Sequence, residues 1–278
     1  MKFAFSSNAF LRYGLLDTIR IVSSIGYRGI EIMADVPHAY PLSMSEKHLK
    51  EIRKQIDSSG MEISNVNAFM HHADGDTYHP SWIENEPDLR LKRVDFTLRC
   101  IEMAGKLGVA NISTEPGGPL EDMSREEGVR LFIDGLRLVE KTARACKVRI
   151  LIEPEPGLLI EKSDQFLEII KQLDPEIFGI NFDIGHFYCV GEDPSQLIIQ
   201  MKPYIHHFHL EDIAPTREHH HLMLGHGDID IHQVLDTVRE INYDGYVTVE
   251  LYTYEHEAEK AASEAYDFIQ TYLSTRTT

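Results

Sequence analysis

Hydrophobic residues recur along the chain with two alternating spacings. Short runs rich in β-branched and aromatic residues, which are typical of strands, are followed by longer stretches with apolar residues every three to four positions, which are typical of amphipathic helices. Strands are predicted over residues 2–8, 28–34, 61–69, 110–116, 149–156, 178–186, 205–212 and 245–252. Helices are predicted over residues 15–26, 45–60, 88–108, 124–146, 163–173, 194–201, 230–242 and 257–273. Ser45 is a candidate N-cap and Gly60 a candidate stop for the second helix.

The order of these elements predicts the fold class. Strands that alternate with helices pair in parallel through right-handed crossovers. Eight such pairs in 278 residues predict an α/β protein with a closed (β/α)8 TIM barrel, as a single domain over residues 1–278. An open, doubly wound sheet is the competing arrangement. It is disfavoured because no glycine-rich phosphate loop follows the first predicted strand.

Net charge, cysteine content and the lengths of apolar runs indicate which kinds of partner and which cellular compartment to expect. The formal net charge of −18 disfavours nucleic acid and anionic membranes as partners, although bound metal ions could override this at one pocket. The three cysteines have no metal-type spacing and are expected to be reduced thiols. The first residues are too polar for a signal peptide, and no apolar run is long enough to cross a membrane. We therefore expect a cytoplasmic protein, with a homo-oligomer left open.

Four consecutive predicted strands end in a side chain that can bind a divalent metal ion. In a TIM barrel the carboxyl ends of the strands meet at the active-site face, so these side chains are expected to converge. Three carboxylates and one imidazole suit Mn²⁺, Mg²⁺, Co²⁺ or Zn²⁺, and the absence of thiolates argues against a structural zinc site. The predicted ligands are Glu153, Asp183, His209 and Glu250.

Further polar side chains fall at the same predicted face and leave the number of ions open. Eight of the fifteen histidines lie within residues 206–232. Strand alternation puts His207 and His209 on one face, with His209 nearer the mouth. The candidates for a second metal site are His72 (with His71 as its neighbour), Glu115, His186, His219 and His221.

The motifs NFDIGH, HFHLED, HHHLMLGHGDID and YVTVELY resemble the xylose isomerase-like barrel superfamily over nearly the whole chain. That superfamily holds sugar and sugar-phosphate isomerases and epimerases, 3-dehydroshikimate dehydratases and endonuclease IV. The resemblance implies one Mn²⁺ or similar ion on Glu153, Asp183, His209 and Glu250. It also implies that Glu153 and Glu250 act as acid and base on opposite faces of the substrate carbon, and that His186 contacts the substrate.

The likeness to endonuclease IV implies a different site with three zinc ions. Where that enzyme has His-Pro-Gly after strand 4, this chain has Glu115-Pro116-Gly117. Where it has Asp-x-His before the last strand, this chain has His219 and His221. Metal-capable groups thus persist with altered residue types, and hydrolysis of a phosphate ester stays open as a reaction.

Three hypotheses follow for the function. The first is a divalent-metal-dependent isomerase or epimerase that moves a proton next to a carbonyl of a sugar, sugar phosphate or cyclitol. The second is a hydrolase of phosphoesters with two or three ions, and the third is a barrel without catalysis, against which the complete ligand set argues. Few basic residues near the mouth disfavour a phosphorylated substrate. The candidate substrate contacts are His186, Arg217, Glu155, Phe69 and Trp82.

Overall fold

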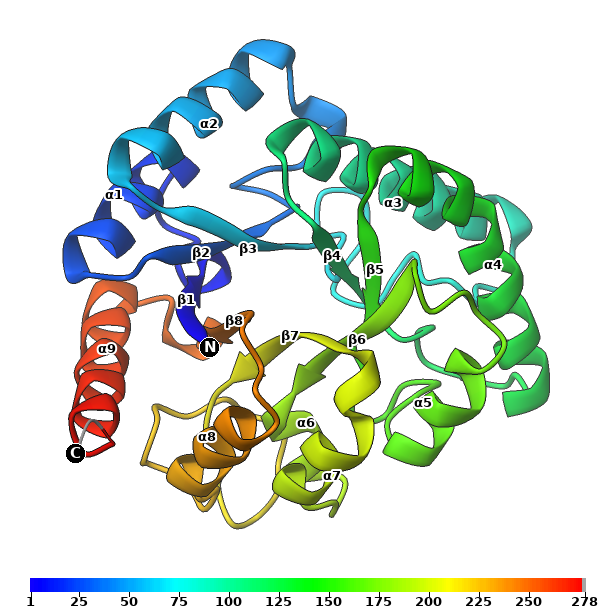
Figure 1. Ribbon diagram of the computed structural model, residues 1–278. Coiled ribbons are helices and arrows are strands. Elements are labelled where there is room, and N and C mark those ends of the chain that lie inside the picture. The colour runs from blue at the N-terminus through cyan, green and yellow to red at the C-terminus, as the bar shows by residue number, and fades with distance from the viewer. Residues whose placement is uncertain (277–278) are drawn as a thin grey trace.

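The structure is a computed structural model and describes residues 1–276. Eight parallel strands pair in chain order, and β8 pairs with β1 to close the barrel (Figure 1). This confirms the predicted (β/α)8 TIM barrel. The strands are β1 (Lys2–Ser6), β2 (Gly29–Met33), β3 (Glu62–Asn67), β4 (Asn111–Thr114), β5 (Arg149–Ile152), β6 (Phe178–Asp183), β7 (Ile205–Leu210) and β8 (Tyr246–Val249).

Helices surround the barrel and follow the strands as expected (Figure 1). They are α1 (Leu15–Ile25), α2 (Glu46–Ser59), α3 (Pro87–Leu107), α4 (Arg125–Cys146), α5 (Ser163–Ile170), α6 (Ile184–Cys189), α7 (Pro194–Met201), α8 (Ile231–Glu240) and α9 (Ala258–Ser274), with short 3₁₀ helices η1 (Ser7–Ala9), η2 (Pro41–Ser43), η3 (Lys202–Tyr204) and η4 (Tyr252–Tyr254). Ser45 caps α2 through the His48 amide, and Gly60 ends it in the left-handed conformation. None of the helices in residues 1–276 is long and apolar enough to span a membrane.

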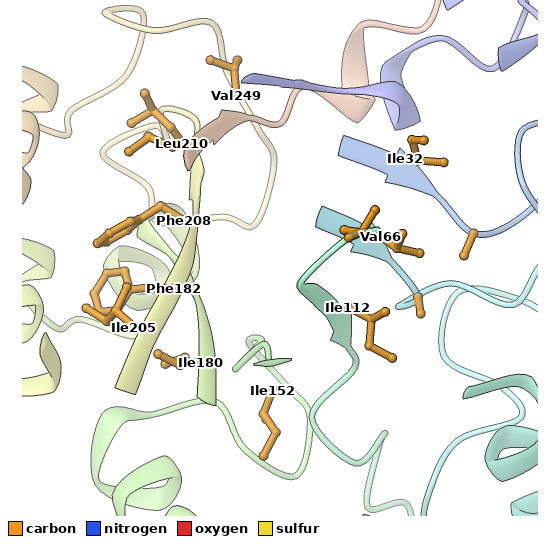
Figure 2. Packing of buried hydrophobic residues seen from close by; sticks show 14 of the residues in the cluster. Ile32, Val66, Ile112, Ile152, Ile180, Phe182, Ile205, Phe208, Leu210 and Val249 are labelled. Atoms are coloured by element: carbon orange, nitrogen blue, oxygen red, sulfur yellow. The ribbon is translucent and has the colours of Figure 1, made fainter. Parts of the chain in front are cut away.

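The hydrophobic core lies between the strands and the surrounding helices. Apolar strand residues such as Ile112, Phe182 and Phe208 are fully buried, and Figure 2 shows their side chains directed away from the barrel axis. The rings of Phe182 and Phe208, on adjacent strands, have centroids 5.5 Å apart. Burial of this outer layer holds the barrel closed and fixes which strand residues point inward.

Inward-pointing strand residues are mostly polar, unlike the branched apolar layers typical of TIM barrels. His207 lies beneath the mouth, with Nδ1 2.8 Å from Asn181 Oδ1 and Nε2 2.8 Å from Thr248 Oγ1. On the opposite side, Asn65 Nδ2 donates to Ser113 Oγ at 2.9 Å. The barrel interior is therefore a hydrogen-bonded polar layer that supports whatever binds at its mouth.

The main departure from the predicted elements follows β6. The strand was expected to continue through residue 186, but it ends at Asp183, and α6 begins at Ile184. Asp183 is the N-cap of α6, and its Oδ1 accepts a 2.7 Å hydrogen bond from the His186 amide. A carboxylate at this position satisfies a free amide of the first turn and so favours a helix over a longer strand. His186 therefore projects from a helix at the mouth.

Candidate metal-binding active site

Barrel closure brings the four predicted ligands together at the mouth. Ligand atoms of Glu153, Asp183, His209 and Glu250 all lie within 4.8 Å of one another. His209 is at the centre, because its Nδ1 lies 2.7 Å from Glu153 Oε1 and 3.3 Å from Glu250 Oε2. The third carboxylate oxygen, Asp183 Oδ2, is 3.7 Å from the same nitrogen. Three carboxylates thus face one edge of a single imidazole ring.

Burial and unpaired oxygens indicate that this cluster fits a cation. Glu153 Oε2 and Asp183 Oδ2 are buried and have no hydrogen-bond partner. Buried anionic oxygens without partners are costly unless a positive charge compensates them. Burial opposes ionisation of His209, but the nearby carboxylates of Glu153 and Glu250 outweigh burial and raise the pKa of the ring well above its usual value. A proton on His209 and a divalent ion are alternative sources of positive charge here.

Side chains that the sequence analysis missed hold these ligands in place. Asn8 Nδ2 donates to Glu250 Oε1 at 2.8 Å, and Asn67 Nδ2 lies 3.4 Å from the same oxygen. On the far edge of the His209 ring, Nε2 lies 2.9 Å from Glu31 Oε2. A charged residue in the otherwise apolar run GIEIM was the available signal for Glu31. Asn8 gave no such signal, since its role depends on the pairing of β1 with β8.

A second cluster consists of three histidines whose Nε2 atoms converge. His219 Nε2 lies 3.0 Å from His186 Nε2 and 3.3 Å from His221 Nε2. His186 and His221 direct Nδ1 at the carbonyls of Pro154 and Glu250, each at 2.9 Å, which leaves Nε2 free to accept a metal. Nitrogens of a tetrahedral zinc site lie about 3.3 Å apart, given Zn–N bonds of 2.0–2.1 Å. The two printed spacings are thus close to those of nitrogens that share one zinc ion.

Glu211 is another carboxylate at the junction of the two clusters that the sequence analysis missed. It is fully buried, and ligand atoms of Asp183, Glu211, His221 and Glu250 lie within 4.8 Å of one another. Its Oε1 accepts a hydrogen bond from the Gly185 amide, while its Oε2 has no partner. Burial, followed by the adjacent Asp183, raises the pKa of Glu211 well above its usual value.

Above the ligands lies a cavity of about 750 Å³, large enough for a small polyol or sugar. Two of the four ligands, Glu153 and Glu250, reach its lining, whereas Asp183 and His209 are fully buried below it. No lysine or arginine lines this cavity in the described part of the chain. Five carboxylates do so: Asp35, Glu153, Glu155, Glu250 and Glu255.

Glu155 and Tyr78 form a polar pair on the wall of this cavity. The Tyr78 hydroxyl donates to Glu155 Oε1 at 2.8 Å, and His219 Nδ1 lies 3.7 Å from that oxygen. Burial is the main reason that the pKa of Glu155 rises to about 8. A neutral carboxyl can both donate and accept hydrogen bonds, which suits a substrate hydroxyl.

Comparison with known families agrees with this arrangement of fold and site. The model of the xylose isomerase-like TIM barrel family matches residues 19–272. The chain belongs to the xylose isomerase-like TIM barrel family. Members of this family differ in their reactions, so the membership establishes the fold and ancestry and leaves the reaction to the site itself.

The chain is also similar to three individual proteins. An inosose dehydratase of Clostridium beijerinckii is 26% identical over 141 residues, which cover 45% of this chain and 47% of that protein. The structure of a D-tagatose 3-epimerase-like protein superposes with a TM-score of 0.83 at 24% identity, covering 99% of this chain and 98% of the other. The structure of an IolI protein with a bound zinc atom has a TM-score of 0.82 at 20% identity, with 100% of both chains covered.

Two residues predicted for a second metal site lie elsewhere in this xylose isomerase-like barrel. His72 lines the cavity, but its Nε2 is 2.9 Å from Thr77 Oγ1 within the long loop after β3. Glu115 is fully buried and accepts hydrogen bonds from the amides of Trp82 and Gly117. Neither belongs to any of the metal-capable groups within residues 1–276. The loop conformation, which local sequence patterns do not fix, decides both positions.

Of the predicted substrate contacts, Glu155, His186 and Phe69 line the cavity, whereas Trp82 and Arg217 do not. Trp82 is 1% exposed and belongs to the core, where its indole nitrogen donates to Thr114 Oγ1 at 3.0 Å. Arg217 lies over the Tyr188 ring and donates to its carbonyl oxygen at 2.7 Å. Neither side chain reaches the cavity in this structure.

Proposed function

We propose that this protein is a divalent-metal-dependent isomerase or epimerase of a sugar or cyclitol. The observation that carries the proposal is the buried set Glu153, Asp183, His209 and Glu250, with unpaired carboxylate oxygens, at the floor of a cavity of about 750 Å³. The donor set suits Mn²⁺, Co²⁺, Mg²⁺ or Zn²⁺. Similarity to an inosose dehydratase, an epimerase-like protein and a zinc-bound IolI protein supports this choice.

When bound, the ion would polarise a substrate carbonyl and the hydroxyl next to it. Glu153 and Glu250 are the two ligands that also reach the cavity, and they come from strands on different sides of His209. One of them removes the proton next to the carbonyl, and the other returns a proton to the substrate. Asn8 holds Glu250 through Oε1, which leaves Oε2 turned toward His209 and the cavity floor.

The cavity wall suits an uncharged, hydroxyl-rich substrate. Glu155 and Tyr78 offer a donor and an acceptor to substrate hydroxyls, and Phe69 and Tyr252 offer apolar surface to the C–H face of a ring. Because five carboxylates and neither lysine nor arginine line the cavity in the described residues, a phosphorylated or acidic substrate is disfavoured. We therefore favour unphosphorylated ketoses and keto-cyclitols.

The test is to replace each glutamate by glutamine and to follow proton exchange. A panel of ketoses, keto-cyclitols and their phosphates is incubated in D₂O with the metal-loaded protein, and NMR records deuterium entering next to the carbonyl. For the substrate that exchanges, Glu153→Gln and Glu250→Gln are expected to lower kcat by about 10²- to 10⁴-fold, as loss of an acid or base does. Glu255→Gln, which removes a rim carboxylate that is not a ligand, serves as the control. Near-normal turnover by either ligand variant would contradict the proton-transfer roles.

The alternative is a phosphoester hydrolase with two or three ions, and the convergent histidines His186, His219 and His221 favour it. Two ions a few ångströms apart would activate water and stabilise the leaving oxygen. Counting bound metal per chain, in the wild type and in His219→Ala, separates the two functions. One ion in both proteins favours the isomerase. Two or three ions in the wild type, reduced by one in the variant, together with water-dependent cleavage of a phosphoester into an alcohol and a phosphate or phosphomonoester, would favour the hydrolase.

A further inference from the structure

Glu31 is a buried carboxylate that lies deeper in the barrel than the metal-capable cluster at the mouth. It is in the middle of β2, is 0% exposed and points into the barrel interior. Its Oε1 accepts a hydrogen bond from Ser6 Oγ at 2.7 Å, and its Oε2 accepts one from Asn65 Nδ2 at 2.9 Å. Asn67 Nδ2 lies 3.5 Å from Oε1. Neighbouring strands thus supply donors that suit an ionised carboxylate.

The His209 ring lies between Glu31 on one side and the carboxylates of Glu153, Asp183 and Glu250 on the other. Nε2 is 2.9 Å from Glu31 Oε2, whereas Nδ1 is 2.7 Å from Glu153 Oε1. Glu250 Oε2 and Asp183 Oδ2 are also on the Nδ1 side, at 3.3 and 3.7 Å. The Nδ1 edge of the ring therefore faces the three carboxylates at the mouth, and the Nε2 edge faces Glu31.

Glu31 is the acceptor available to Nε2 among the described residues. The other group near this nitrogen is Asn181 Nδ2 at 3.4 Å, which is a donor and is also 3.2 Å from Nδ1. The side-chain oxygen of Asn181, Oδ1, lies at hydrogen-bond distance from His207 Nδ1 (2.8 Å). The side-chain NH₂ of Asn181 therefore faces His209. Within residues 1–276, Glu31 is consequently the group that can accept a hydrogen bond from a proton on Nε2.

An imidazole that binds a cation presents a lone pair on one nitrogen and keeps a proton on the other. The partner of the protonated nitrogen fixes the tautomer and the ring orientation and raises the basicity of the coordinating nitrogen. We propose that Glu31 is a positioning residue that keeps the proton on His209 Nε2 and presents Nδ1 to a divalent ion held with Glu153, Asp183 and Glu250. The inference rests on the proposed function, because that ion is the one the proposed reaction uses.

Metal affinity is the first readout. Zn²⁺ or Co²⁺ affinity is measured by chelator competition in the wild type, Glu31→Ala and Glu31→Gln, with folding checked by circular dichroism. Loss of the partner of a ligand histidine typically weakens metal binding 10- to 100-fold, which is the effect expected for Glu31→Ala. Glu31→Gln is expected to retain more affinity, because its amide oxygen can still accept from Nε2. Ser64→Ala serves as the matched control, since it removes a buried hydrogen bond with Thr248 in the same polar interior without contacting a ligand.

The protonated nitrogen of His209 is the second readout and requires no variant at Glu31. Long-range ¹H–¹⁵N NMR of the zinc-loaded wild type, assigned with His209→Gln, is expected to show the proton on Nε2 and the metal on Nδ1.

The Co²⁺ absorption spectrum is a third readout. It is expected to change in Glu31→Ala and to stay unchanged in Ser64→Ala. A proton on Nδ1, or unchanged affinity and spectrum in Glu31→Ala, would overturn the positioning role.

The proposed function and this inference fail in different ways. If Glu153→Gln binds divalent ions as tightly as the wild type does, the metal site itself is misplaced and both proposals fall. If Glu153→Gln loses the ion while Glu31→Ala keeps it with wild-type affinity and spectrum, the metal site stands and only the role of Glu31 falls.

Discussion

At the scale of single residues, a few carboxylates are buried in the interior, whereas most of the charges lie on the surface. The chain has 45 acidic residues, and among the described ones Glu31, Glu115, Asp183, Glu211 and Asp212 are completely buried. Burial raises the pKa of Glu115 to about 7, with Arg93 acting in the opposite direction. Glu31 has its pKa lowered to about 2, because His209 and Asn65 outweigh the effect of burial. The pKa of a buried glutamate is thus raised at one position and lowered at the other, because the neighbouring groups differ.

Glu115 is expected to make stability depend on pH. Its folded pKa of about 7 exceeds the ordinary value of 4.5, so between these values the folded state holds a proton that the unfolded state releases. The free energy of unfolding of the wild type therefore decreases as the pH rises through this window. Glu115→Gln has no ionisable group at this position and does not show the decrease. The free energy of unfolding of Glu115→Gln minus that of the wild type should therefore increase by up to about 3 kcal/mol when the pH is raised from 4.5 to 8.

Urea denaturation at both pH values measures this difference. Glu126→Gln, which removes an exposed carboxylate in the first turn of α4, is the control and should show a nearly constant difference from the wild type. A difference for Glu115→Gln that does not change with pH would contradict the raised pKa.

At the scale of elements, the loop between β3 and α3 is held by side chains of the elements around it. Arg93 of α3 is fully buried, and its Nε donates to Pro80 O at 2.8 Å while Nη1 donates to Phe69 O at 2.9 Å. Trp82 belongs to the loop itself, and its ring packs edge to face against Phe132 of α4. These contacts fix Phe69 and Tyr78, the part of the loop that lines the cavity.

Arg93→Met is expected to destabilise the protein by about 2–4 kcal/mol, because buried carbonyl oxygens then lose their donors. Protease cleavage and hydrogen exchange should increase within residues 70–86 before the rest of the chain unfolds. Arg99→Met on the same helix is the matched control, since Arg99 forms an exposed ion pair with Asp95 that is worth about 0.5 kcal/mol. Equal effects of the two substitutions would show that Arg93 does not anchor the loop.

At the scale of the whole molecule, closure of the barrel assembles the site from distant parts of the chain. Pairing of β1 with β8 brings Asn8 to Glu250, which is 242 residues away in sequence. Glu31 of β2 meets His209 of β7 across the barrel interior, although these strands are not neighbours in the sheet. A divalent ion at this junction would link strands that otherwise interact only through the barrel wall.

Metal binding is therefore expected to stabilise the whole barrel. An ion present at 1,000 times its Kd should raise the free energy of unfolding by about 4 kcal/mol, and chelation should reverse the gain. Asp183→Asn is the informative variant, because asparagine can still cap α6 but provides no anionic ligand. Thermal unfolding with and without the ion measures the effect. A gain in Asp183→Asn as large as in the wild type would place the stabilising ion elsewhere.

The sequence by itself determined the barrel and the convergence of Glu153, Asp183, His209 and Glu250 at its mouth. Apolar periodicity reports which face of each element is buried, and eight alternating elements leave few topologies. Because parallel strands end at one face, ligand-type residues at four strand ends had to meet. Element ends were less certain: the strand expected through residue 186 ended at Asp183, where its carboxylate caps α6.

Only the tertiary structure decided which other side chains join these ligands. Glu31 and Asn8 reach the site across the barrel, and no local pattern encodes a contact between residues so far apart in sequence. Trp82 and Glu115 turn away from the mouth because the long loop after β3 folds onto α3 and α4, driven by packing and by hydrogen bonds of Arg93. The meeting of the strand ends at one face follows from the backbone geometry of a parallel barrel. The positions of side chains in the loops and in the barrel interior depend on contacts that form only when the barrel closes.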